Sequence, residues 1–364
     1  MKILQTIKYF EPSKGGMESV VKNLVVGIKR NTYDSDITVI CNNHEKSSKT
    51  IKEKLLNVNV VRYKSFFYKS QPISLFFKGL SKHLIDSDVI NHHYPFPTME
   101  LALLKNIKIL KKKNFIITWH ANIENSRWSW IEKFYNPIIK QLLNSATKIV
   151  VTSPQLFEYS PILKNYRHKI EIIPLSYEAQ NEFIYPKTLN GQLKILFVGK
   201  LREYKGLKYL IEATRNLDVI VDIVGNGEQE QELRDLVKAT NQEEKVKLHT
   251  DVNDVELKKY YKNAHIFVLP SINEAEAFGV VQLEALSYAL PVINTNLKSG
   301  VPYVSLNNIT GFTIAPLNST ELQKAIIKII DNPTLYADFS RNALERAKEF
   351  TTEKMVKKYL SLYV

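Results

Sequence analysis

The feature that most constrains the fold is an alternation of short β-branched runs with longer amphipathic stretches, which restarts near residue 194. The first half predicts strands at 2–7, 36–41, 57–62, 88–91, 115–119 and 147–152, with helices at 17–30, 97–112 and 128–144. The second half predicts strands at 194–198, 219–224, 245–248, 265–269 and 291–294, with helices at 206–216, 228–239, 254–262 and 279–289. This alternation indicates an α/β protein with parallel sheets covered by helices on both faces.

The length of 364 residues exceeds the usual size of a single core, so we predict two doubly wound domains. The segment 177–192 contains Pro186 and Gly191 and lacks a clear period, which predicts a linker. The domains are then 1–176 and 193–345, followed by a C-terminal helix at 346–364. Ligands of such sheets bind beyond the carboxyl ends of strands and in clefts between domains, so residues that directly follow strands are the candidates for function.

Composition narrows the cellular setting. The single cysteine, Cys41, excludes an internal disulfide, follows an apolar run and is expected to be buried and inert. No apolar run reaches the ~18 residues that span a bilayer, and the first residues form a strand pattern rather than a signal peptide, so we expect a cytoplasmic protein. The net charge of +13 predicts an anionic partner, unless it is largely solvated surface lysine.

The strongest motif is the segment 270–285, which follows one predicted strand and opens a predicted helix. Gly279 permits a close backbone approach, and the helix start offers N–H donors to a phosphate. Glu276 and Glu284 are eight positions apart, so both would face one cleft if Glu284 lay two turns into the helix. Carboxylates accept hydrogen bonds from sugar and ribose hydroxyls. An ordinary helix-start acid and a solvated glutamate remain the alternative.

Two further strand–loop–helix junctions carry glycines and cations. In 197–207, the cations Lys200, Arg202 and Lys205 could neutralise a diphosphate. Lys200 and Lys205 each adjoin a glycine and are the better candidates. For Arg202 we favour a solvated side chain. In 8–18, Gly15 and Gly16 at a helix start indicate either an anion nest or a tight turn.

Histidines end two predicted strands of the first half. His120 could hydrogen-bond a substrate hydroxyl, although a lone histidine is more often structural, and His93 carries the same ambiguity.

The sequence lacks the motifs of several other ligand-binding and catalytic sites. The segment 224–230 has Glu230 where a dinucleotide fingerprint needs its third glycine, and no metal-ligand spacing, phosphate-binding P-loop or serine elbow occurs.

Taken together, the motifs resemble those of retaining glycosyltransferases of the GT-B fold, family 4, over nearly the whole chain. The Glu-x7-Glu motif corresponds to Glu276 and Glu284, and Gly-Arg-Leu…Lys-Gly corresponds to 199–206 with Lys200 in place of arginine. The Gly-Gly-x-Glu motif corresponds to 15–18, and His120 matches the family histidine. A narrower likeness at 119–123, 151–154, 173–175 and 294–305 points to a bacterial subgroup that builds O-antigen and capsule. Members of that subgroup often have aspartate at the position that Asn122 occupies here.

This resemblance implies a fold and a mechanism. It implies two Rossmann-like domains with an interdomain cleft, a C-terminal helix that packs back on the first domain, and hexose transfer with retention and without a metal or other cofactor. Glu276, His120 and Lys205 would be catalytic. The donor would contact Gly15, Gly16, Lys200, Lys205, Phe278, Gly279, Val280 and Glu284. GDP-mannose-type donors are favoured over UDP-sugars, and Asn122 and His93 are acceptor candidates.

The resemblance also implies a lipid-linked oligosaccharide acceptor at the inner face of the cytoplasmic membrane. Aromatics and lysines mix in 63–84, and a second basic cluster follows at 105–113. Such surfaces suit an anionic membrane, although a core helix with a solvated face explains them nearly as well. A non-catalytic sugar-nucleotide-binding protein and a sugar-nucleotide epimerase are the alternatives on this fold. No nucleic-acid motif accompanies the charge, so nucleic acid is not expected as a partner.

Overall fold

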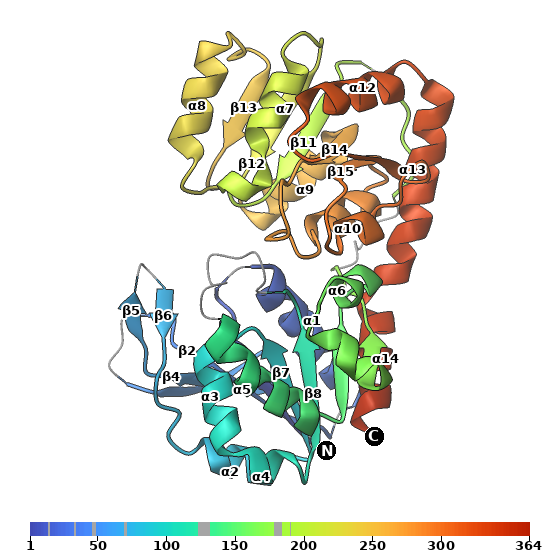
Figure 1. Cartoon of the computed structure of the whole chain (residues 1–364). Helices are drawn as coiled ribbons and strands as arrows, with labels where there is room; N and C mark the ends of the chain where they lie inside the picture. The colour runs from blue at the N-terminus through green and yellow to red at the C-terminus, as the bar shows by residue number, and fades with distance from the viewer. Residues whose placement is uncertain are drawn as a thin grey trace. The chain divides into compact units, whose positions relative to one another are not determined.

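The computed structural model describes residues 1–13, 15–32, 34–45, 49–68, 71–122, 132–177, 184–189 and 191–364. The chain divides into two compact units (Figure 1). The first unit contains Met1–Ser176 and Thr352–Val364, and the second contains Tyr177–Thr351. The stretch predicted as a linker therefore belongs to the second unit where it is described. There, the Lys187 amide donates to Ser340 Oγ at 2.7 Å and its ammonium donates to carbonyls at the end of a helix.

The first unit is built on an eight-stranded sheet with the order β10-β9-β8-β7-β1-β2-β4-β3. Only β3 runs antiparallel to its neighbour; the other pairings are parallel. The strands are β1 (Lys2–Thr6), β2 (Asp36–Asn42), β3 (Ile51–Leu55), β4 (Val58–Tyr63), β7 (Val89–Tyr94), β8 (Asn114–Trp119), β9 (Lys148–Val151) and β10 (Ile170–Ile172), and a separate hairpin pairs β5 (Phe66–Tyr68) with β6 (Gln71–Ile73).

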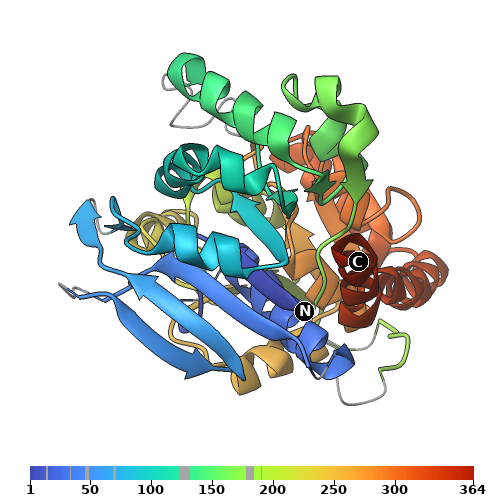
Figure 2. The ribbon, with the colours of Figure 1, turned by 90° about the horizontal axis from the view of Figure 1, so that it is seen from below.

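Helices cover both faces of this sheet, as its fully buried central strands require. One face packs against α2 (Leu80–Asp86), α3 (Pro97–Lys105), α4 (Ile107–Leu110) and α5 (Glu132–Ser145) through a core that includes Leu4, Ile90 and Ile117. The other face is covered by α1 (Gly16–Asn31) and the C-terminal helix α14 (Thr352–Tyr363), whose end lies beside the N-terminus of the chain in Figure 2. The two helices pack together where Val356 lies close to Gly27. The short helix α6 (Pro154–Glu158) follows β9, and a 3-10 segment spans Leu163–Lys169.

The second unit is a six-stranded parallel sheet with the order β13-β12-β11-β14-β15-β16. Its strands are β11 (Lys194–Val198), β12 (Ile220–Val224), β13 (Val246–His249), β14 (Ile266–Leu269), β15 (Val292–Thr295) and β16 (Gly311–Ile314). Its helices are α7 (Leu207–Thr214), α8 (Glu230–Ala239), α9 (Asp254–Asn263), α10 (Val281–Ser287), α11 (Val301–Val304), α12 (Ser319–Ile330) and α13 (Pro333–Ala347), with 3-10 turns at Glu203–Lys205 and Lys348–Phe350. The strand order reverses between β11 and β14, which makes this the topological switch point.

The α/β class with two doubly wound parallel sheets is confirmed, and all the predicted strands are present. Their ends agree with the prediction within two residues, except that β7 runs three residues further, to Tyr94. The prediction missed the short elements β3, β5, β6, α2, α6, β10, α11 and β16. It also missed two longer helices, α12 and α13. The predicted helix at 97–112 is two helices, because Asn106 interrupts it. Within 63–84, the alternative of a core helix is wrong, since this segment holds the β5–β6 hairpin before α2 begins at Leu80.

Candidate active site

The two strongest sequence motifs meet at the switch point of the second unit. β11 and β14 are neighbours in the sheet, so the loops that leave their carboxyl ends, 199–206 and 270–280, start side by side. A backbone hydrogen bond from Ile272 N to Tyr204 O at 2.8 Å ties the loops together. The topology therefore brings together residues that are far apart in the sequence.

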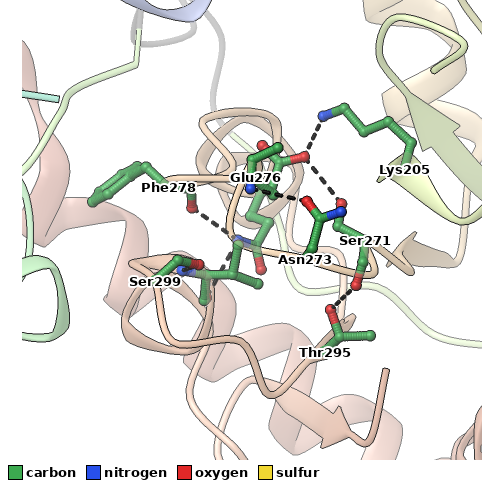
Figure 3. Close-up of polar contacts among 10 residues, drawn as sticks. Lys205, Ser271, Asn273, Glu276, Phe278, Thr295 and Ser299 are labelled. Carbon is green, nitrogen blue, oxygen red and sulfur yellow. Dashed lines mark hydrogen bonds and ion pairs between the residues drawn. The ribbon is translucent and has the colours of Figure 1, made fainter. Parts of the chain in front are cut away.

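An ion pair between Lys205 and Glu276 is the centre of this site (Figure 3). The Lys205 ammonium donates to Glu276 Oε2, and Ser271 Oγ donates to the same oxygen at 3.0 Å. The Lys205 residue is 7% exposed and the Glu276 residue 8%. Burial lowers the pKa of the Lys205 ammonium, but Glu276 and Tyr204 outweigh it, so that pKa lies above its ordinary value. The pair is therefore a buried, charged and hydrogen-bonded one.

The loop around Glu276 is held by its own polar groups. Asn273 Oδ1 accepts from Ala275 N at 3.0 Å and its carbonyl accepts from Glu276 N, which shapes the turn before the carboxylate. Thr295 Oγ1 donates to Ser271 O at 2.5 Å and anchors the loop to the end of β15. Because the backbone that leads into Glu276 is fixed in this way, its carboxylate is pre-positioned.

Two glycines allow the backbone of these loops to adopt positive φ angles and to approach its neighbours closely. Gly206 has φ +67°, and a Cβ there would lie 2.2 Å from Pro270 O, so only glycine lets the Lys205 loop approach β14. Gly279 has φ +74°, and a Cβ would lie 2.7 Å from Leu269 Cδ2. The glycines of 224–230, by contrast, pack on the Lys200 loop: a Cβ at Gly225 would meet Gly199 O at 1.9 Å. This packing accounts for that motif without a dinucleotide.

Glu284 does not lie two turns into a helix, as its spacing from Glu276 suggested. The segment after Glu276 forms turns, so α10 begins only at Val281 and Glu284 lies in its first turn. Its Oε2 accepts a hydrogen bond from Tyr261 Oη at 2.6 Å. Burial and the charge of Glu284 raise the pKa of the Tyr261 phenol well above its ordinary value, so Tyr261 remains a donor. Glu284 is thus a half-buried carboxylate oriented by a tyrosine of α9.

The remaining candidates for donor binding in the second unit differ in their exposure and in their contacts. Lys200 and Arg202 are exposed, so only Lys205 among the three cations is buried. The Phe278 ring is buried against Phe350 at a centroid distance of 6.3 Å, and the Phe278 carbonyl accepts from Gln282 Nε2. Phe278 therefore anchors the loop by its side chain. Gly279 and the half-buried Val280 directly precede α10.

In the first unit, His120 and His93 form a buried pair. His93 Nδ1 and His120 Nε2 lie 2.9 Å apart, and His93 Nε2 lies 2.9 Å from Gln5 Oε1. Burial, with the neighbouring histidines, lowers the pKa of His120 to about 3 and that of His93 well below its ordinary value. Both ring nitrogens of His93 have partners within the protein, and its acceptor role stays a prediction.

The other candidates of the first unit, Asn122, Gly15 and Gly16, have partners other than the two histidines. Asn122 Oδ1 accepts from Trp119 Nε1 at 2.8 Å and its amide nitrogen donates to Leu156 O, which gives Asn122 a structural role. Gly15 is the N-cap of α1 and Gly16 its first residue. A Cβ at Gly15 would lie 2.3 Å from Glu18 Oε2, so the Glu18 carboxylate lies close to Gly15, and the anion nest stays a prediction.

Sequence reasoning missed several residues that build the site. Ser271 follows Pro270 in the motif itself, so its position five residues before Glu276 was a usable signal. Tyr261 had no such signal. Gln282 and Asn294 lie inside segments already singled out, but their contact was not foreseen: Gln282 is fully buried and its Oε1 accepts from Asn294 Nδ2 at 2.8 Å.

Over the described ranges, no three His, Cys, Asp or Glu side chains gather as a metal-ligand cluster would. Cys41 is fully buried, and burial raises the pKa of its thiol to about 12, as expected for an inert thiol. None of the helices in the described residues has the length and apolarity needed to span a membrane.

Comparison with known proteins gives a consistent result. The E. coli protein "O-antigen chain mannosyltransferase C" is 28% identical over 100% of this chain and 98% of its own length. The Pseudomonas aeruginosa "D-rhamnosyltransferase WbpZ" is 29% identical over 76% of this chain and 73% of its own. The solved sucrose-phosphate synthase of Thermosynechococcus elongatus superposes with a TM-score of 0.78 at 19% identity, covering 100% of this chain and 98% of that one.

Family models match both units in turn. The model "Glycosyltransferase Family 4" matches residues 14–179, and "Glycosyl transferases group 1" matches residues 180–346. The match of both models in this order, on two Rossmann-like units, agrees with the motifs at Glu276 and Lys205. The chain is a glycosyltransferase of the GT-B fold and belongs to the family 4 type.

Proposed function

We propose that this enzyme transfers a hexose from a nucleotide-diphosphate sugar, with retention of anomeric configuration, to a lipid-linked oligosaccharide of a bacterial surface polysaccharide. The observation that carries the donor side is the buried Lys205–Glu276 pair at the switch point. The names of the relatives, an O-antigen mannosyltransferase and a D-rhamnosyltransferase, support the polysaccharide and a mannose-type sugar. The preference for GDP over UDP as the carrier of that sugar comes from the resemblance of the motifs.

The ion pair suggests how the site is prepared for its donor. The diphosphate of an arriving donor competes with Glu276 for the Lys205 ammonium. Lys205 then balances the charge that develops on the departing diphosphate. Glu276, which Ser271 still holds, becomes available to accept hydrogen bonds from hydroxyls of the sugar. Glu284, oriented by Tyr261, would hold the ribose, and His120 would hydrogen-bond the transferring sugar.

This chemistry needs no metal, because a lysine supplies the positive charge at the leaving group. We therefore expect turnover to persist with excess EDTA. Loss of activity in EDTA, restored by a divalent cation, would refute a metal-free mechanism.

Product analysis tests the proposed reaction. The enzyme is incubated with GDP-mannose or UDP-glucose and a lipid-linked oligosaccharide, and the new linkage is read by NMR. We expect an α-linked product and no turnover without acceptor. Donor consumption without acceptor would indicate an epimerase instead, and binding without any turnover would indicate a sugar-nucleotide-binding protein.

We also propose that the enzyme contacts an anionic membrane from the cytoplasmic side through the surface formed by 75–82 and 98–108. A pocket of about 400 Å³ opens between these two segments. Its lining includes Phe76, which is 83% exposed, and Leu101, together with the cations Lys78 and Lys105. Exposed apolar side chains among lysines suit an anionic bilayer surface.

Sedimentation with vesicles tests this surface. We expect the protein to bind vesicles that contain phosphatidylglycerol at low salt and not those of phosphatidylcholine alone, and Phe76→Ser to weaken binding. Val255→Ser, at a 70% exposed valine of the second unit, is the matched control. Equal binding by Phe76→Ser and wild type would exclude this surface.

A further inference from the structure

A chain of hydrogen bonds connects the C-terminal helix to His120 through the interior of the first unit. Gln5 Nε2 donates to Tyr363 Oη at 3.0 Å, and Gln5 Oε1 lies 2.9 Å from His93 Nε2. His93 Nδ1 in turn lies 2.9 Å from His120 Nε2. The four residues come from β1, α14, β7 and the end of β8, and all are at most 4% exposed.

Strand alternation explains why these polar side chains share one face of a buried sheet. Successive residues point to opposite faces, so Gln5, Asn91 and His93 lie on the face that α14 covers, whereas His92 points to the α3 side and contacts Glu100. Asn91 Nδ2 donates to Tyr363 Oη at 3.2 Å, so this hydroxyl accepts two hydrogen bonds. A core of this kind would normally be apolar, and buried polar groups of this number are costly unless they are all paired.

The donors and acceptors along this series of hydrogen bonds can be assigned from the chemistry of each group. Gln5 Oε1 can only accept, so His93 Nε2 carries the proton of that contact. A neutral His93 then has an unprotonated Nδ1, which accepts from His120 Nε2. The proton of a neutral His120 is thus on Nε2, and its Nδ1 has a lone pair. Within the residues that the structure describes, this buried Nδ1 has no hydrogen-bond partner.

We infer that Tyr363, Gln5 and His93 are positioning residues that hold His120 as the Nε2–H tautomer, so that its Nδ1 accepts a hydrogen bond from a substrate hydroxyl. The contact with substrate rests on the proposed function, whereas the tautomer does not. The low pKa of both histidines agrees, because neither is protonated near neutral pH. The C-terminal helix thereby gains a role in the reaction beyond packing.

The test combines Tyr363→Phe with a matched control on the same helix. Phenylalanine keeps the ring and removes the acceptor for Gln5 Nε2, so the glutamine amide loses its fixed orientation. Tyr359→Phe also removes one hydroxyl, which lies 3.1 Å from Thr118 Oγ1. Thr118 Oγ1 still donates to Asn91 Oδ1 in that control, so the chain to His120 remains intact.

The tautomer is read by long-range ¹H–¹⁵N NMR on ¹⁵N-histidine-labelled full-length protein, with His120 assigned by His120→Gln. We expect the Nε2–H pattern in wild type and Tyr359→Phe, and a mixture of tautomers in Tyr363→Phe. We expect kcat to fall about tenfold in Tyr363→Phe with the donor KM unchanged. An Nδ1–H pattern in wild type, or an unaltered spectrum and kcat in Tyr363→Phe, would overturn the inference. Normal turnover of His120→Gln with the expected spectra would instead remove His120 from the proposed function.

Discussion

The Lys205 ammonium donates to Glu276 Oε2 across 71 positions of the sequence, and Ser271 Oγ donates to the same oxygen. The pair is buried where two neighbouring parallel strands end, which is where ligands bind on doubly wound sheets. A buried ion pair is weak evidence for a stabilising role, since its desolvation offsets much of its attraction. Its position therefore favours a role in binding an anionic donor.

Replacement of Glu276 by glutamine is expected to lower kcat by about 100-fold or more, because the amide cannot provide the negative charge of the carboxylate. Glutamine keeps the size of the side chain and can still accept from Ser271, so the fold should persist. Turnover of Glu276→Gln and of the control Glu274→Gln, two positions earlier in the loop, is measured beside circular dichroism spectra. Near wild-type turnover of Glu276→Gln would remove Glu276 from the mechanism.

Tyr261→Phe is expected to raise the donor KM about tenfold, with kcat nearly unchanged, because Glu284 loses the hydrogen bond that orients it. The neighbouring Tyr260→Phe on α9 serves as the control, since its ring lies beside His249 instead. Steady-state kinetics with varied donor gives both constants. If Tyr261→Phe lowered kcat and left KM unaltered, Glu284 would not be the ribose ligand.

Gly206→Ala should destabilise the protein by about 2–4 kcal/mol, because the new Cβ meets Pro270 O in addition to the strain of positive φ. Gly191 has the same φ of +67° with no atom within 4 Å of a Cβ. Gly191→Ala should therefore cost only the strain, about 1 kcal/mol. Chemical denaturation measures both. Equal costs for the two variants would show that the approach of the Lys205 loop to β14 is not tight.

The buried histidines predict a loss of stability in acid. The folded-state pKa of His120 is about 3, below its ordinary value of 6.5, and that of His93 is also lowered. Below pH ~6.5 the unfolded chain therefore binds protons that the folded chain does not, and stability falls as pH falls toward the folded pKa. His120 contributes a loss of about 2 kcal/mol between about pH 7 and about pH 5, and His93 adds a loss in the same direction.

His120→Gln isolates the contribution of His120 to this loss of stability, because the variant and the wild type have all other titrating groups in common. The stability advantage of wild type over His120→Gln should shrink toward pH 5, as denaturation curves at several pH values would show. A difference that is independent of pH would mean that His120 titrates normally in the folded state.

Much of the fold was predictable because its signals are local. Short β-branched runs that alternate with amphipathic helices gave the two parallel sheets, and the strand–loop–helix junctions gave Lys205 and Glu276. The short edge strand β3 was missed, since its Ile51–Leu55 sequence is mostly charged and its backbone pairs only with β4. The α2 helix was missed because aromatic and basic residues of 63–84 obscure its short period.

The site was less predictable, because side-chain partners depend on strand order. Nothing in the sequence near Glu284 indicated Tyr261, and nothing near His120 indicated Gln5 or Tyr363. The donor role of Phe278 stays a prediction from the motif, and the packing of its ring on Phe350 was not foreseen. The sequence around Gly15 and Gly16 likewise did not indicate that the Glu18 carboxylate lies close to Gly15.

Calorimetric titration of GDP and UDP into wild type and Lys205→Met tests the central claim most directly. We predict that wild type binds one of the two nucleotides and that Lys205→Met binds it about 100-fold more weakly, because a charge-assisted contact to the diphosphate is lost. The exposed Lys208 offers a control, Lys208→Met, that should bind like wild type. If Lys205→Met bound the nucleotide as tightly as wild type, or wild type bound neither, the Lys205–Glu276 pair would not be the donor site.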